Sequence, residues 1–213
     1  MADQNLLIEI QSHLEKKPLK ENLRPLFCET LHWGHPRGLT SQPVTLGAPL
    51  SVQLTATPVA QLSGLPVFSI DWPEDRTPTV TTRRALHRAL ASAHAEHLIC
   101  YITQDQRQIA FTWARKRPDG KNELRTLPYE VGTPARTTIE RLGELAFTLD
   151  ELGPTGQPLI TTLTDKLNRA FDVEAVTKKF YQEIANWYFW ARDYVKFPIP
   201  KGEKNTDAYI AQN

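Results

Sequence analysis

Two stretches decide the fold, Leu65-Pro66-Val67-Phe68-Ser69-Ile70-Asp71 and His97-Leu98-Ile99-Cys100-Tyr101-Ile102-Thr103. Each is an apolar run of strand length, and the sequence between them predicts a helix from Arg83 to about His94, capped by Thr81 or Thr82. A strand–helix–strand connection is nearly always a right-handed crossover that makes its two strands parallel. The sequence therefore predicts a sheet that contains a parallel pair.

Further strand signals flank this unit on both sides. Thr40 to Pro49 reads as a polar, proline-containing loop, after which alternating polar and apolar residues predict half-buried strands. A Ser63-Gly64 hairpin turn leads into the first stretch, and Pro118-Asp119-Gly120-Lys121 has strong turn chemistry. Because these connections are short, the strands that they join are antiparallel. The predicted strands are Leu50 to Ala56, Val59 to Leu62, Gln108 to Ala114 and Leu124 to Val131.

Helical patterns occupy both ends of the chain. Thr137-Thr138-Ile139-Glu140 has the spacing of a capping box and opens a helix that ends near Leu149. Gly153-Pro154-Thr155-Gly156 reads as a linker, which predicts an α/β (α+β) domain over residues 1–152 and a helical connector over residues 153–213. The other predicted helices are Asp3 to Lys16, Leu19 to His32, Thr161 to Ala170 and Val173 to Tyr194.

Composition excludes several classes of protein. The 25 lysines and arginines nearly balance the 24 acids, and the net charge of +1 gives no global attraction to nucleic acid or membrane. No apolar run approaches the roughly 20 residues of a membrane-spanning helix, and Met1 to Glu9 is unlike a secretory signal. Cys28 and Cys100 lie in apolar surroundings, which indicates buried free thiols. We therefore expect a cytoplasmic protein that does not bind membranes.

Signatures of common catalytic and metal sites are absent from the sequence. It contains no GxGxxG, no P-loop, no paired CxxC and no GxSxG. His94 and His97 flank the end of a predicted helix, where histidines commonly interact with free carbonyl groups. The histidine clusters are therefore interpreted as structural, and no resident metal is expected.

Two basic clusters are candidates for contact with DNA phosphates. Guanidinium groups match phosphate oxygens well, but a solvated helix face and a charged turn explain the same residues. The near-neutral charge of the chain favours the solvated interpretation. The clusters are Arg83, Arg84 and Arg88 on the outer face of the crossover helix, and Arg115, Lys116, Arg117 and Lys121 at a hairpin tip.

The last predicted helix is aromatic on several faces. A helix that is apolar nearly all round must be buried on more than one side. Such burial is provided either by a partner or by this chain itself. The aromatic residues are Tyr181, Trp187, Tyr188, Phe189, Trp190 and Tyr194.

The stretch from Phe171 to Tyr181 resembles the segment that leads into the methyltransferase domain of type IIG-like restriction–modification enzymes and related phage-defence adenine methyltransferases. The stretches His94 to Cys100 and Phe111 to Arg115 are similar to the same family. The resemblance implies that the chain is the N-terminal part of a larger protein whose methyltransferase domain uses S-adenosylmethionine. The family's glycine-rich cofactor loop and its Asn/Asp-Pro-Pro-Tyr/Phe motif do not occur here, so this chain should need no cofactor and should not transfer methyl groups.

In some members of that family the N-terminal region is a Mg²⁺-dependent nuclease of the PD-(D/E)xK kind. That chemistry needs an Asp and then an acid and a lysine two residues apart on the adjoining strand. Asp71, Glu29 and Glu74, with Asp75 as a substitute, are the candidate acids, but no lysine falls at the required place. We therefore expect a degenerate, non-catalytic nuclease-like core that contacts duplex DNA or braces the methyltransferase domain. The alternatives are a Mg²⁺-dependent endonuclease and a protein–protein interaction module.

Overall fold

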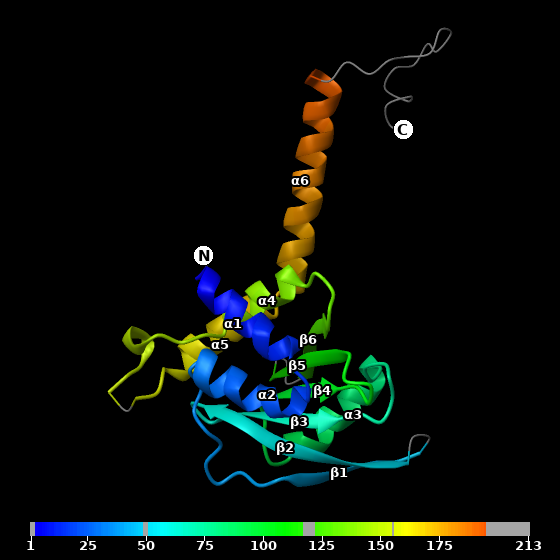
Figure 1. Ribbon diagram of the computed structural model, residues 1–213, viewed down its shortest axis with the longest axis vertical. Coiled ribbons are helices and arrows are strands. Elements are labelled where there is room, and N and C mark those ends of the chain that lie inside the picture. Colours follow the sequence, from blue (N-terminus) through cyan, green and yellow to red (C-terminus); the bar gives the residue numbers. More distant parts are fainter. Residues whose placement is uncertain (1–2, 49–50, 117–121, 155, 195–213) are drawn as a thin grey trace. The chain divides into compact units, whose positions relative to one another are not determined.

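A mixed sheet of six strands in sequential order, β1 to β6, forms the centre of the fold (Figure 1). The computed structural model describes residues 3–48, 51–116, 122–154 and 156–194. It divides the chain into two units, Met1–Phe171 and Asp172–Asn213, and the sheet lies in the first. The strands are β1 (Gln42–Leu46), β2 (Val52–Leu62), β3 (Leu65–Asp71), β4 (His97–Ile102), β5 (Gln108–Lys116) and β6 (Asn122–Glu130).

The predicted parallel pair is confirmed. β3 and β4 run parallel and pair Val67 with Leu98 and Asp71 with Ile102, whereas every other neighbouring pair of strands is antiparallel. The connection between β3 and β4 is helix α3 (Val80–Ala91), which the side chain of Thr79 caps by accepting the Thr82 backbone N–H. The cap is therefore two or three residues earlier than predicted.

Helices cover both faces of the sheet (Figure 1). On one face, buried residues of α1 (Gln4–Glu15), α2 (Leu19–Pro25), α4 (Arg136–Gly143) and α5 (Ile160–Ala170) pack in one core with alternate strand residues. On the other face, α3 packs on the remaining strand residues. Since side chains alternate along a strand, Val67 points to the first core, whereas Phe68 and Ile70 point to the α3 side. The fold is therefore a mixed α/β sandwich of three layers.

The segment before β3 departs from prediction in two ways. Residues 42–46, predicted as loop, form β1, which pairs with β2 along the edge of the sheet. The two strands predicted at residues 50–56 and 59–62 are one strand, β2, whose register shifts between Pro58 and Ala60. A proline has no N–H for the ladder, so a register shift at this point lets the strand continue past it.

The predicted helix ends also differ from the structure. The helix expected from Leu19 to His32 is α2 followed by a five-residue π-helix, η1 (Leu26–Thr30). The predicted capping box at residues 137–140 does not form, because α4 begins at Arg136 without a side-chain cap. A capping box is instead present at Thr148 and Glu151, around the 3₁₀ helix η2 (Leu149–Glu151).

The helices predicted as a single connector belong to different units. α5 contributes Leu163, Leu167 and Ala170 to the core of the first unit, which extends to Phe171 and not only to residue 152. α6 (Val173–Tyr194) belongs to the second unit. Within α6, large apolar side chains are exposed at Tyr181, Ile184, Trp187, Phe189, Trp190 and Tyr194.

Candidate functional site

Asp71 ends β3 on the face of the sheet that carries α1 and α2, and it forms an ion pair with Lys20. The Lys20 Nζ lies 2.6 Å from the Asp71 Oδ2, and both side chains are partly open to solvent. α2 holds Lys20 in this position because its neighbour Leu19 is buried in the core and donates its backbone N–H to the Gln106 side chain at 3.1 Å. The carboxylate is thus neutralised by a helix from the beginning of the chain.

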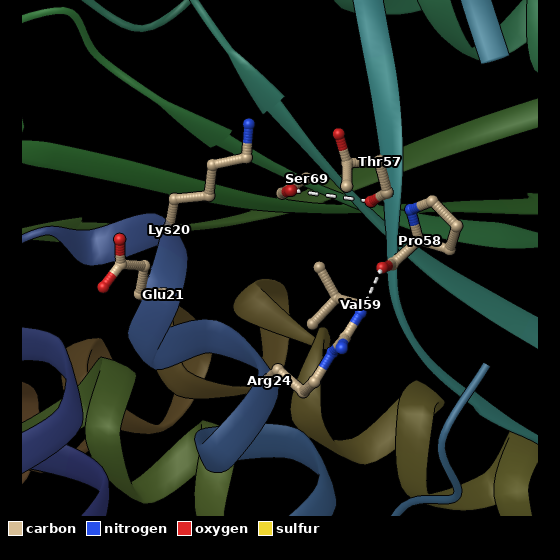
Figure 2. A pocket seen from close by; sticks show the side chains of 7 residues that line it. All are labelled: Lys20, Glu21, Arg24, Thr57, Pro58, Val59 and Ser69. Carbon is tan, nitrogen blue, oxygen red and sulfur yellow. Dashed lines mark hydrogen bonds between the residues drawn. The ribbon is translucent and has the colours of Figure 1, made fainter. Parts of the chain in front are cut away.

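A cavity of about 420 Å³ lies beside this ion pair, between α2 and strands β2 and β3 (Figure 2). The Ser69 hydroxyl donates to the Thr57 carbonyl oxygen at 3.5 Å, and Arg24 donates to the Pro58 carbonyl oxygen at the same distance. In Figure 2 the Arg24 side chain extends from α2 to Pro58, whereas the Glu21 carboxylate points away from Ser69. The residues around the cavity are Lys20, Glu21, Arg24, Thr57, Pro58, Val59 and Ser69.

This cavity does not have the composition of a two-carboxylate metal site. β2 and β3 pair Thr57 with Ser69, so the strands contribute hydroxyl groups and no carboxylate to its lining. Asp71 is two residues beyond Ser69, and its partner lysine comes from α2 and not from the same strand. Within the part of the chain that the structure describes, no three His, Cys, Asp or Glu residues are grouped so that they could hold a metal ion.

The other predicted acids lie apart from this arrangement. Glu29 is exposed on η1, where its charge acts on His13, and Glu74 and Asp75 are exposed in the segment after β3. The Glu74 backbone carbonyl accepts the Gln104 N–H at 3.0 Å. Among the candidate acids, Asp71 is therefore the one that pairs with a residue of the cavity lining, Lys20.

The predicted basic residues have different environments. Arg83 is half-buried and donates to the hydroxyl groups of Thr112 and Thr126, whereas Arg84 is exposed on α3. Arg115 is partly buried near the end of β5. The Lys116 side chain, Arg117, Lys121 and the predicted turn at 118–121 are outside the described residues.

A buried pair of histidines lies on the α3 side of the sheet. His97 contacts the His94 backbone carbonyl through Nδ1 at 2.8 Å, as the position of both at a helix end predicted. A carbonyl only accepts, so the His97 Nδ1 carries the proton and its Nε2 accepts from the His87 Nδ1, also at 2.8 Å. Burial lowers the pKa of His87 well below its usual value, and it lowers the pKa of His97 to about 4. Both rings are therefore neutral at pH 7.

Sequence reasoning missed the two interactions that define these sites. Lys20 and Asp71 are 51 residues apart, and His87 and His97 belong to different elements. The sole sequence signal for the first pair was a charged residue at the end of an apolar strand, which does not identify its partner.

Comparison of the chain with protein-family models, with curated proteins and with solved structures found no match. Among the described residues, no helix is both long enough and apolar enough to cross a membrane.

Proposed function

We propose that this chain is the N-terminal, non-catalytic, nuclease-like part of a DNA restriction–modification or phage-defence methyltransferase, and that it contacts duplex DNA or braces the methyltransferase domain. The order of elements supports the proposal: helices, the three strands β1 to β3, the crossover helix α3 and then β4. This is the helix–strands–helix–strand order expected of a PD-(D/E)xK core.

The single observation that carries the non-catalytic part is the Lys20–Asp71 ion pair beside hydroxyl-lined strands. Mg²⁺ in nuclease sites is held by carboxylates that remain free to bind it. Here Asp71 already has a cationic partner at 2.6 Å, and Thr57 and Ser69 occupy the paired strand positions. A lysine that neutralises the acid competes with the metal instead of activating water.

Contact with DNA is supported by exposed cations outside the cavity. Arg84 and Arg88 lie one turn apart on α3, and both are exposed. Neither forms an ion pair within the described chain. Because the chain as a whole is nearly neutral, this local patch would supply the attraction to phosphates.

Incubation of the purified chain with supercoiled plasmid and Mg²⁺ or Mn²⁺ tests the absence of catalysis. We expect no nicked or linear product. Nicking by the wild type that is abolished in Asp71→Ala but retained in Asp150→Ala would instead establish the endonuclease alternative. Asp150 is the matched control because it is an exposed acid on η2 that is not among the candidate acids and does not line the cavity.

Fluorescence anisotropy with a labelled duplex tests the DNA contact. We expect affinity to fall as salt rises, and the Arg84→Gln/Arg88→Gln variant to bind more weakly with a smaller salt slope. Arg136→Gln is the control, since Arg136 is also exposed but pairs with Glu140 at 2.7 Å. If no duplex is bound even at low salt, the DNA contact is excluded and a role in protein–protein interaction remains.

The exposed aromatic residues of α6 support the second part of the proposed role, which is to brace the methyltransferase domain. Trp187 is 65 % exposed and Trp190 is 54 % exposed, and burying such rings stabilises an interface. The occupant that the family resemblance implies is the methyltransferase domain, which would carry S-adenosylmethionine.

Intrinsic tryptophan fluorescence of the purified chain, titrated with a separately purified methyltransferase domain, tests this bracing role. We expect a blue shift that is reduced in Trp187→Ala and retained in Gln182→Ala, since Gln182 is an exposed polar residue of the same helix. Equal responses of the two variants would exclude α6 as the contact.

A further inference from the structure

Arg83 reaches from the first turn of α3 across the sheet to strands β5 and β6. Its Nη1 donates to the Thr126 hydroxyl at 2.5 Å and to the Thr112 hydroxyl at 3.5 Å, and the two hydroxyls are 3.0 Å apart. Thr112 and Thr126 are paired residues of neighbouring strands. Two strands therefore supply a pair of hydroxyl groups that fixes the guanidinium group.

The charge of Arg83 has no carboxylate partner. Within the described chain no acid lies within ion-pair distance of Arg83, although the side chain is half-buried. Burial lowers the pKa of Arg83 from its usual value, which shows that the surroundings disfavour the cation. A buried charge is normally compensated by an ion of opposite sign.

Unused hydrogen-bonding groups accompany this cation. The Arg83 Nε and the Tyr101 hydroxyl are buried and have no partner in the described part of the protein. Tyr101 lies close enough for its charge state to act on Arg83, and burial raises its pKa, so the hydroxyl keeps its proton and can donate. The Arg83 Nη2 also makes no hydrogen bond but is not buried, so it reaches solvent.

Small and polar side chains lie beside Arg83 on β5 and β6. On the helical face, β5 and β6 contribute Ile109, Phe111, Trp113, Leu127 and Tyr129 to the core. On the α3 side, the alternate residues of β5 are Ala110, Thr112 and Ala114, and all three are buried. A small polar ligand therefore reaches Arg83 from the side on which its Nη2 meets solvent.

We propose that Arg83, Thr126 and Tyr101 form a binding site for one tetrahedral oxyanion, the phosphate group, on the face of the sheet opposite the Lys20–Asp71 cavity. The guanidinium group supplies the charge and the Nε and Nη2 donors, while Thr112 and Thr126 hold it in place. Arg84 and Arg88, exposed on the same helix, raise the positive potential around the site. The phosphate comes either from the free ion or from a nucleic-acid backbone, and only the second source rests on the proposed DNA contact.

Thermal unfolding in rising concentrations of inorganic phosphate, with ionic strength held constant by chloride, tests the site. We expect a saturable rise in Tm for the wild type. In Arg83→Gln the apparent Kd for phosphate should rise by roughly tenfold or more, because the charged, forked donor is lost. Arg136→Gln removes the same charge from α4, which packs on the other face of the sheet, and should bind phosphate nearly as well as the wild type.

Thr126→Val keeps the shape of the side chain but removes the hydroxyl that orients Arg83, and it provides a second variant if Arg83→Gln does not fold. It should also weaken phosphate binding. An equal loss in Arg136→Gln and Thr126→Val, or a wild-type Tm that follows ionic strength alone, would show diffuse attraction and overturn the site.

A short labelled duplex distinguishes the two sources of phosphate. Competition between duplex and inorganic phosphate, with weaker duplex binding in Thr126→Val, would place a backbone phosphate in the site. Binding of phosphate but not of duplex would support the free ion and would refute the proposed DNA contact alone. Duplex binding that is unchanged in Thr126→Val and unaffected by phosphate would uphold the DNA contact and refute a backbone phosphate in the site.

Discussion

Acidification should destabilise this protein through the buried His87–His97 pair. The two rings stack with centroids 4.7 Å apart, and each nitrogen that joins them has a fixed role. A proton added to the His97 Nε2 would place an N–H against the N–H of His87, with Arg83 nearby and no acid among the described residues to compensate the charge. The folded protein therefore resists protonation at both rings.

The magnitude follows from the pKa of His97, which burial lowers from 6.5 to about 4. Because the folded state binds fewer protons than the unfolded state below pH 6.5, the free energy of unfolding falls as the pH falls through this range. Between pH 7 and pH 5 the loss from His97 alone is about 2 kcal/mol. The lowered pKa of His87 acts in the same direction.

Urea unfolding at pH 7, 6 and 5 measures this loss. The His97→Asn variant cannot titrate at this position, although Asn can still donate to the His94 carbonyl, so its stability should fall less with acid than that of the wild type. His35→Asn is the control, since His35 is exposed and should leave the wild-type dependence unchanged. If wild type and His97→Asn lost stability in parallel between pH 7 and pH 5, the assignment of the effect to the buried pair would be refuted.

Two further changes should destabilise the fold at neutral pH. Lys166 is 8 % exposed, and its ammonium group donates to the Ala146 carbonyl and lies 4.5 Å from the Phe147 ring centroid. Lys166→Met should therefore lower the free energy of unfolding, measured in urea, by about 2 kcal/mol. The control Arg136→Met, at an exposed position, should lower it by less than about 0.5 kcal/mol. Gly34 forms an isolated antiparallel β-bridge with Gln61, and a methyl group on Gly34 would lie 3.0 Å from the Gln61 backbone oxygen. Gly34→Ala should therefore lower the free energy of unfolding by about 1–3 kcal/mol. An unchanged urea midpoint would show that the backbone of this β-bridge moves to accommodate the methyl group.

The central unit of the fold could be predicted because its signals are local. The apolar runs of β3 and β4 and the amphipathic α3 between them are each contained in a short stretch of sequence, and crossover handedness then leaves one arrangement. β1 was missed although Val44 and Leu46 alternate with exposed residues, because its surroundings are rich in proline, glycine and polar side chains. An edge strand of five residues is stabilised by pairing with β2 and not by its own propensity.

The features that could not be predicted depend on tertiary contacts. The π-helical turn at Leu26–Thr30 continues a helix that Leu26 and Phe27 anchor in the core, and its helical pattern in the sequence is the same as that of an α-helix. Thr79 caps α3 because the chain enters the helix directly after Pro78, whereas Thr81 and Thr82 offered the same chemistry two and three residues later. The spacing of residues in the sequence thus predicts where each helix or strand lies, whereas tertiary packing determines the residues at which it begins and ends.

The two candidate sites lie on opposite faces of the sheet, and this separation follows from the alternation of strand residues. Ser69 and Asp71 point to the side of α2, whereas the alternate residues Phe68 and Ile70 pack on the α3 side, where Arg83 lies. No described contact joins the Lys20–Asp71 pair to Arg83, so changes at the two sites should act independently. A loss of phosphate binding in an Arg83 variant therefore cannot be attributed to a disturbed Asp71, because the intervening sheet is packed on both faces and leaves the ion pair intact.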